Sequence, residues 1–117
     1  MATTVDLEET IREAVRRLVE ALDPEMVILF GSAARGEFGP DSDLDFLVVV
    51  PEERLGYKTT SRAREALRGL AVAKDLCWTT PARLREYRDV RWTIEQAATS
   101  EGRVLYDRPA VTAASRR

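Results

Sequence analysis

Histidine is absent from this chain of 117 residues, and cysteine occurs only once, as Cys77. Without an imidazole, neither a Ser-His-Asp nor a Cys-His nucleophile system can be built. The usual zinc sites made of Cys and His, and any disulfide within the chain, are excluded as well. Chemistry in this protein would therefore depend on carboxylates, hydroxyls, arginines, backbone amides and a hard cation.

The chain also lacks an excess of charge and a long apolar run. Eighteen Lys and Arg stand against twenty Asp and Glu, a formal net charge of −2, so no direct nucleic-acid binding is expected. The apolar run 46–50 is far too short to cross a bilayer. The acidic start of the chain is unlike a signal peptide. We therefore expect a globular, cytoplasmic protein without a membrane partner.

Hydrophobic periodicity predicts helices that alternate with buried strands. Asp6 and Glu9 have the spacing of a capping box, and the apolar stripe behind them predicts a helix over 6–22. The expected strands are unbroken apolar runs of the kind that is covered on both faces. These runs are 26–30 and 44–50, and we also expect a third strand at 71–78 and a short edge strand at 103–106.

The remaining helices follow from apolar spacing and from end signals. A helix is predicted over 60–70, and another begins at Thr80-Pro81, where Thr caps and Pro fits the first turn. A stripe through Val90, Ile94 and Ala97 predicts its continuation as far as Gly102 at the C′ position. The fold class is therefore α/β or α+β, with helices packed on a small mixed central sheet. We expect one domain over 1–107, a flexible tail over 108–117, and Cys77 as a small buried apolar residue.

A strand that runs into Gly31-Ser32 is the first candidate functional element. Gly31 lets the backbone approach a ligand closely. Ser32 offers a hydroxyl where the free amides of a following helical segment would hold a phosphate. Arg35, one turn further on, can add a fixed cation with several donors, although it could instead pair with Glu37 or with Asp41.

The second candidate element is Asp43-Leu44-Asp45 at the start of a strand. Side chains at i and i+2 face the same side, so the two carboxylates project together, roughly 6–7 Å apart. A hard divalent cation relieves their repulsion, and two such cations with phosphate oxygens serve phosphoryl or nucleotidyl transfer. Asp75 is the best candidate for a third carboxylate, with Lys74 pointing to the opposite face. An exposed Asp on an edge strand would give the same pattern.

The spacing of Asp41, Asp43 and Asp45, with Glu52 at the twelfth place, imitates a calcium EF-hand loop. That loop needs Gly at its sixth position, where this chain has Phe46. An EF-hand is therefore rejected.

Gly31-Ser32, ten further residues and then Asp43-Leu44-Asp45 resemble the signature of the DNA polymerase beta nucleotidyltransferase superfamily. The fuller pattern, Gly-Ser-x-x-Arg-Gly over 31–36 and Ser-Asp-x-Asp over 42–45, resembles its minimal nucleotidyltransferase branch of antitoxin type. The resemblance implies a nucleotide site that holds ATP or another nucleoside triphosphate, made of Gly31, Ser32, Arg35 and Ser42. It also implies two Mg²⁺ ions, bound by Asp43, Asp45 and Asp75, with Asp75 helping to deprotonate the attacking hydroxyl.

The resemblance further implies a partner, a helical HEPN-domain protein that is the toxin of a toxin–antitoxin pair and receives AMP on a hydroxyl. Two features depart from the family. Ala33 and Ala34 stand where many relatives carry a basic residue, and we expect no substrate-binding domain in a chain of this length. Two functions therefore remain open: a protein adenylyltransferase, or a protein that neutralises its partner by occlusion with a vestigial nucleotide site. The base, the acceptor and a possible homo-oligomer also remain open.

Overall fold

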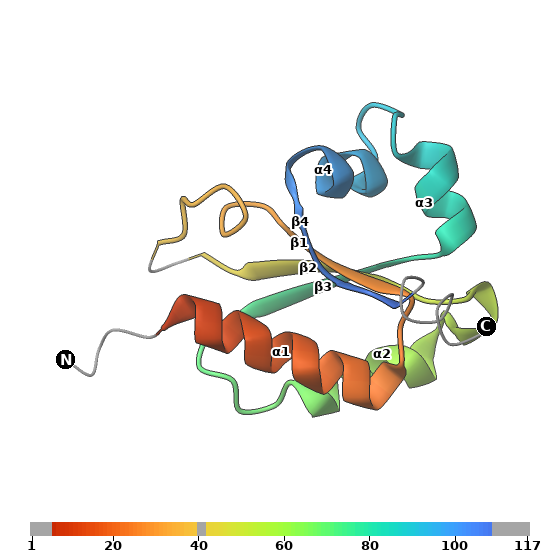
Figure 1. Cartoon of the computed structure of the whole chain (residues 1–117). Coiled ribbons are helices and arrows are strands. Elements are labelled where there is room, and N and C mark those ends of the chain that lie inside the picture. Colours follow the sequence, from red (N-terminus) through yellow and green to blue (C-terminus); the bar gives the residue numbers. More distant parts are fainter. Residues whose placement is uncertain (1–5, 40–41, 109–117) are drawn as a thin grey trace, which may run out of the picture.

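The chain alternates helices with strands that join in one sheet (Figure 1). The computed structural model describes residues 6–39 and 42–108. Its elements are α1 (Leu7–Leu22), β1 (Met26–Phe30), β2 (Leu44–Val49), the 3-10 helix η1 (Glu52–Arg54), α2 (Tyr57–Ala66), β3 (Lys74–Thr79), α3 (Pro81–Tyr87), α4 (Ile94–Glu101) and β4 (Arg103–Asp107). The predicted tail 108–117 falls outside the described residues from position 109 onward.

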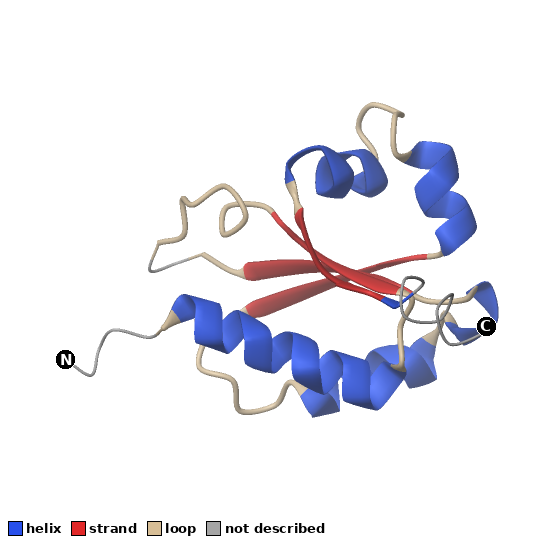
Figure 2. Ribbon diagram, in the orientation of Figure 1, coloured by secondary structure: helices blue, strands red, loops and turns tan. Residues whose placement is uncertain are grey.

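The described part of the chain forms a four-stranded mixed sheet in the order β3-β2-β1-β4. Strand β1 is antiparallel to both β2 and β4, whereas β2 and β3 are parallel. Helices α1 and α2 cover one face, and α3 and α4 cover the other (Figure 2). The predicted fold class is confirmed, because both faces of the central strands are covered by helices.

The first helix forms over the predicted range. The Asp6 carboxylate accepts a hydrogen bond from the Glu9 N–H at 3.2 Å, which is the aspartate half of the predicted capping box. The helix ends at Asp23, which has φ of +48° and precedes Pro24. Its buried stripe consists of Ile11, Ala14, Leu18 and Leu22. This stripe packs on the sheet and anchors α1 there.

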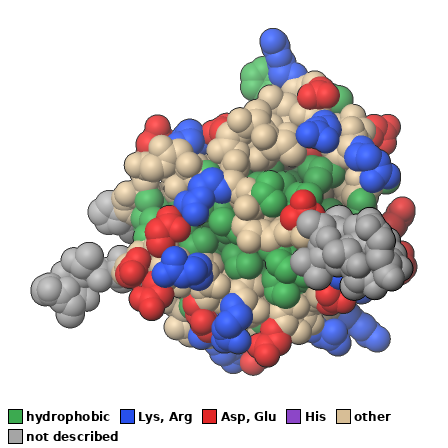
Figure 3. Space-filling model, viewed as in Figure 1, with side chains coloured by type: hydrophobic (Ala, Val, Ile, Leu, Met, Phe, Trp, Pro, Cys, Tyr) green, Lys and Arg blue, Asp and Glu red, His purple; other side chains and the backbone are tan. Residues whose placement is uncertain are grey.

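Alternate residues of β2 serve the two faces of the sheet. Leu44, Phe46 and Val48 belong to a large buried cluster under α1 and α2. Leu47 belongs to a much smaller cluster under α3 and α4, together with Ile28 and Ala98. Figure 3 shows apolar side chains at the level of the sheet, with charges of both signs interspersed around them.

Two predicted elements have different bounds in the structure. Helix α2 begins at Tyr57 and ends at Ala66, whereas 60–70 was predicted. The turn that follows ends the helix early, since the Leu70 N–H donates to the Leu67 carbonyl and Gly69 has φ of +89°. Strand β3 consequently begins at Lys74 and not at position 71.

The predicted stripe through Val90, Ile94 and Ala97 is wrong as a continuous helix. The chain leaves α3 at Tyr87 and starts α4 only at Ile94. Thr93 caps α4, because its hydroxyl oxygen accepts a hydrogen bond from the Gln96 N–H at 3.1 Å. The residue before it, Trp92, has φ of +73°, which no helix allows. Ala98 is the buried alanine of α4, and Ala97 is not.

Gly102 ends α4, but not in the left-handed conformation that is typical of a glycine at C′. Its φ of −90° and ψ of 173° are extended. A Cβ at this position would lie 2.1 Å from the Ala98 carbonyl oxygen and 2.8 Å from that of Leu29. Glycine is therefore required here because the backbone of α4 approaches β1 closely, and β4 follows directly as the predicted edge strand.

No helix in the described ranges is both long enough and apolar enough to cross a bilayer.

Candidate functional site

Gly31, the residue directly after β1, lies against the Asp45 side chain. The register pairs Phe30 with Asp45, so the Asp45 side chain starts beside the last residue of β1. Gly31 has φ of +77°, and a Cβ there would lie 2.3 Å from the Asp45 Oδ2 atom. Both the backbone conformation and the space require glycine. The turn that begins at Gly31 (residues 31–37, the Gly31 turn) therefore lies directly over the Asp45 carboxylate of β2.

The segment after Gly31 forms a single closed turn and no helix, which corrects the predicted helical start. The Glu37 N–H donates to the Ser32 carbonyl at 2.8 Å, and the Gly36 N–H donates to the Ala33 carbonyl at 3.3 Å. With Gly36 at φ of +78°, this is the Schellman pattern that ends helices. Within the described residues, the N–H groups of positions 32–34 have no backbone acceptor. They are donors available to a ligand or to water.

Asp45 and Asp75 are neighbours across the sheet. They are direct partners in the parallel register of β2 and β3, so both side chains are on the face under α3 and α4. Burial raises the pKa of the Asp45 carboxyl, and the negative charges of Asp75 and Asp43 raise this pKa further. Asp43 lies just before β2 and is exposed. The negative charges of Asp43 and Asp75 thus both act on Asp45.

The carboxylates do not form a closed metal cluster. Within the described ranges, no three or more His, Cys, Asp or Glu side chains are grouped closely enough to hold a metal ion. Asp45 and Asp75 are partners in the register of β2 and β3, whereas Asp43 lies just before the first residue of β2. The three carboxylates nevertheless supply oxygen ligands on one side of the sheet. The Asp45 carboxylate has room beside Gly31, because glycine has no Cβ there. In kind, this donor set fits a hard divalent cation.

Arg35 is held by two carboxylates. Its guanidinium contacts Glu37 Oε1 at 3.1 Å and Glu101 Oε1 at 2.8 Å. Hydrogen bonds from Arg35 to Glu101 and then to Glu37 raise the pKa of the guanidinium. Of the two pairings considered for Arg35, the one with Glu37 is present, and Asp41 lies outside the described residues. The contact with Glu101 links the Gly31 turn to α4.

Residues 8–103 match the profile of a protein family described as nucleotidyltransferase domain. The chain belongs to this family. A crystal structure of a toxin–antitoxin with AMP-PNP is similar at a TM-score of 0.62 and 20% identity, over 82% of this chain and 72% of that chain. A protein from Sulfolobus solfataricus, assigned as a nucleotidyltransferase, is similar at a TM-score of 0.56 and 20% identity. That match covers 88% of this chain and 87% of the other.

These likenesses show the fold, and with the family match they identify the chain as a minimal nucleotidyltransferase. No curated protein matches the chain at a significant level. The resemblance inferred from Gly31-Ser32 and from Asp43-Leu44-Asp45 is therefore confirmed.

In this nucleotidyltransferase, Ser42 has a structural contact. Its hydroxyl oxygen accepts a hydrogen bond from the Gly39 N–H at 3.0 Å, and its own N–H donates to the Gly39 carbonyl at 3.1 Å. Ser42 thereby closes the turn that leads into Asp43. Ser32, the other predicted hydroxyl, is half-buried in the Gly31 turn.

Cys77 follows Asp75 on the same face of β3. It is half-buried and packs against the small cluster formed by Ile28, Leu47 and Ala98. Burial raises the pKa of the thiol, and the charges of Asp75 and Asp45 raise it further. A neutral thiol next to the carboxylates agrees with the predicted role as a small apolar residue, although Cys77 is only partly buried.

Sequence reasoning missed a buried contact between the end of β3 and α4. The Thr79 hydroxyl donates to Glu95 Oε2 at 2.6 Å, and both residues are buried. This bond joins β3 to α4, just as Arg35 and Glu101 join the Gly31 turn to α4. One available signal was Glu95 itself, an acidic residue between the apolar positions Ile94 and Ala98.

Proposed function

We propose that this chain is a Mg²⁺-dependent nucleotidyltransferase that moves AMP from ATP to a hydroxyl on a protein partner and releases pyrophosphate. The observation that carries the proposal is the Asp45 carboxylate, which lies against Gly31 and is in register with Asp75. A glycine turn with free amides thus stands beside carboxylates on one face of a sheet. This is the juxtaposition that nucleotidyl transfer needs.

Each proposed group has a distinct task. The free N–H groups at positions 32–34 bind phosphate oxygens, and Arg35, positioned by Glu37 and Glu101, supports the triphosphate. Asp43, Asp45 and Asp75 are the ligands for Mg²⁺, which supplies Lewis-acid neutralisation of charge on the phosphates. Asp75 is exposed, so its carboxylate can accept the proton of the acceptor hydroxyl.

The partner belongs to the proposal as well. One structural neighbour is a toxin–antitoxin that was crystallised with AMP-PNP. That likeness supports a nucleotide site and a protein partner, and we propose that the partner is a helical HEPN-domain toxin. A protein acceptor would supply the surface next to Asp75.

The test combines the chain with the protein encoded beside it, labelled ATP and Mg²⁺. Label should reach the partner. Asp43→Asn combined with Asp45→Asn should lower the rate at least about 100-fold, because the phosphates lose their charge neutralisation. Asp89→Asn, at an exposed site after α3, is the matched control and should leave the rate unchanged. No transfer by the wild type, or equal transfer by the double variant, contradicts the proposal.

A second candidate function is neutralisation by occlusion without catalysis. It is favoured by the absence of a closed three-carboxylate cluster in the described residues and by the two carboxylates that already occupy Arg35. In that case the chain should inhibit its partner without nucleotide, and the double Asp→Asn variant should inhibit equally well. Inhibition that requires ATP and both aspartates would exclude it.

A further inference from the structure

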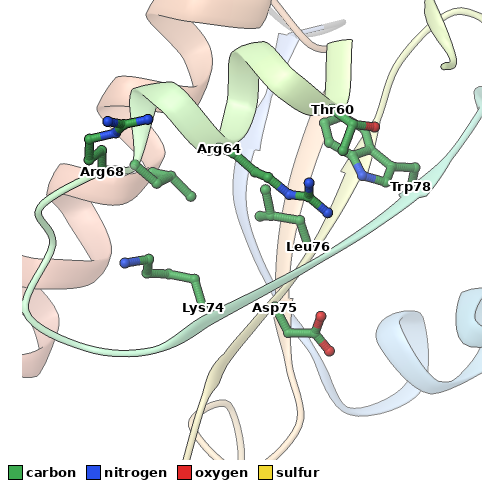
Figure 4. Close-up of a pocket in the computed structure, with 8 residues that line it drawn as sticks. Thr60, Arg64, Arg68, Lys74, Asp75, Leu76 and Trp78 are labelled. Carbon is green, nitrogen blue, oxygen red and sulfur yellow. The ribbon is translucent and has the colours of Figure 1, made fainter. Parts of the chain in front are cut away.

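A cavity of about 280 Å³ lies between α2 and β3, on the opposite side of the strand from the Asp75 carboxylate (Figure 4). Figure 4 shows Arg64 reaching from α2 over β3, while Asp75 points away to the other side of the strand. The side chains that carry the argument are Thr60, Arg64, Arg68, Lys74, Leu76 and Trp78. None of the predicted site residues except Asp75 borders this cavity.

The cavity stands in a basic part of an acidic chain. Positions 57–74 hold five Lys and Arg against a single acid, Glu65, a net of +4 where the whole chain has −2. Arg68 pairs with Glu65 at 2.7 Å. Arg64 and Lys74 have no carboxylate partner within the described residues. These two cations are therefore available to an anionic group.

The floor of the cavity is apolar, and one side of it is the outer edge of strand β3. Leu76 and Trp78 are half-buried, face α2 and pack against the large core cluster. Strand β3 is the last in its sheet and pairs only with β2 within the described residues. Its outer side therefore offers backbone N–H and C=O groups to a further strand.

We propose that this α2–β3 groove docks an extended acidic segment of a protein partner. A carboxylate of the segment pairs with Arg64 and Lys74, and an apolar side chain rests on Leu76 and Trp78. The backbone of the segment adds to the free edge of β3. A peptide suits the groove better than a nucleic acid, because Trp78 is the single aromatic side chain among the described residues that line the cavity, whereas single-stranded nucleic acids stack successive bases on several aromatic rings.

This proposal adds a docking surface to the proposed function. It depends on the proposed function only for the identity of the protein that carries the docked segment. Asp75 lies between Lys74 and Leu76 on the same strand and faces the opposite side. A partner segment along β3 would therefore bring neighbouring residues of the partner to the candidate site. The docked segment is then part of the acceptor protein.

Binding is measured on the full chain without nucleotide or Mg²⁺, so the result does not depend on catalysis. The probe is a fluorescein-labelled peptide with the repeat Ser-Glu-Ser-Val, in which Glu and Val stand two residues apart and share one face of an extended strand, and binding is followed by fluorescence anisotropy. Arg64→Glu with Lys74→Glu should weaken binding at least about tenfold, because like charges then face each other. Added NaCl should weaken wild-type binding, since the pairs are exposed to solvent.

The matched control is Arg83→Glu with Arg85→Glu on α3, where both arginines are exposed on the other side of the sheet. It makes the same change in charge and should leave binding intact. If the groove variant fails to fold, Arg62→Glu with Arg64→Glu, both exposed on α2, replaces it. No peptide binding, equal loss in the control, or tighter binding of single-stranded RNA at the same arginines would overturn the proposal.

A second measurement tests the acceptor role separately. In the transfer reaction with its protein partner, the groove variant should raise the KM for that partner and leave kcat nearly unchanged. A lowered kcat at unchanged KM would contradict docking. Peptide binding without any transfer activity would support the groove and reject the proposed reaction, so the two failures are distinguishable.

Discussion

The two faces of the sheet bury different numbers of apolar residues. We call the face under α1 and α2 the packed face, and the face under α3 and α4 the thin face. Thirteen buried residues form the cluster under α1 and α2, whereas three form the one under α3 and α4, among the described residues. On β2 the difference appears between neighbours, with Phe46 fully buried on the first face and Asp45 half-buried on the second. Burial of apolar area on one face can stabilise the domain. The other face can then carry mutually repelling carboxylates.

The largest expected effect concerns the packed face. Phe46→Ala should lower the free energy of unfolding by about 3–5 kcal/mol, because it removes a fully buried ring and leaves a cavity. Cys77→Ala, on the thin face, removes one half-buried sulfur and should cost less than about 1.5 kcal/mol. Urea unfolding of both variants gives the comparison. Equal losses would mean that both faces contribute equally to stability.

The stability of the thin face should depend on a polar contact, whereas the stability of the packed face depends on apolar packing. Thr79→Val keeps the shape but leaves the buried Glu95 carboxylate without its donor, at a cost of about 1–3 kcal/mol. Thr79→Ser keeps the hydroxyl and should lose clearly less. The free energy of unfolding from urea melts measures both variants. If Thr79→Val is neutral, the bond to Glu95 does not hold β3 to α4.

The two glycines of the Gly31 turn separate backbone strain from contact with the site. Gly36→Ala meets nothing within 4 Å and should cost only the left-handed conformation, about 1 kcal/mol. Gly31→Ala adds a collision with Asp45 to the same backbone strain, so its cost should exceed that of Gly36→Ala by about 1 kcal/mol. It should also displace the carboxylate and lower transfer.

The Asp45 contact can be isolated by a double-mutant cycle. Asp45→Ala removes the carboxylate that a Cβ at position 31 would strike. The loss on Gly31→Ala in that background should therefore fall to the value for Gly36→Ala. Chemical denaturation of the four proteins of the cycle decides the matter. Additive losses would show that Gly31 and Asp45 are not in contact.

Local patterns predicted the elements that local physics controls. The helix over 6–22 and strand β1 follow from apolar spacing and from caps that lie within a few residues. The break between α3 and α4 was hidden, because Val90, Ile94 and Ala97 have helical spacing by coincidence. The break is marked by the N-cap Thr93 and by the positive φ of Trp92, and apolar spacing predicts neither of them.

For the site, the sequence predicted which residues share a face but not which of them meet. The alternation of a strand places Asp43 and Asp45 on one side. The register of Asp45 with Asp75 depends on how two strands thirty residues apart align, which no local pattern encodes. The Arg35 contact with Glu101 spans 66 residues and had no local signal either.

The smallest expected effect concerns an exposed ion pair at the margin of the packed face. Glu13 binds Arg16 and Arg17, and Arg17 in turn donates to the carbonyls of Ala66, the last residue of α2, and of Arg68 in the following turn. Hydrogen bonds from Arg16 and then Arg17 lower the pKa of the Glu13 carboxyl from 4.5 to about 2. The stabilisation from a carboxyl with a lowered pKa is present above pH 4.5 and is lost as the pH falls towards 2.

NMR titration of the Glu13 carboxyl carbon should show this low pKa. Arg16→Gln with Arg17→Gln should return the pKa towards its ordinary value. Glu13→Gln should lower the melting temperature slightly at pH 7 and not at pH 2, since exposed pairs contribute little. A normal pKa in the wild type would show that Arg17 is not oriented by Glu13. The junction of α1 and α2 would then depend on apolar packing alone, as the centre of that face does.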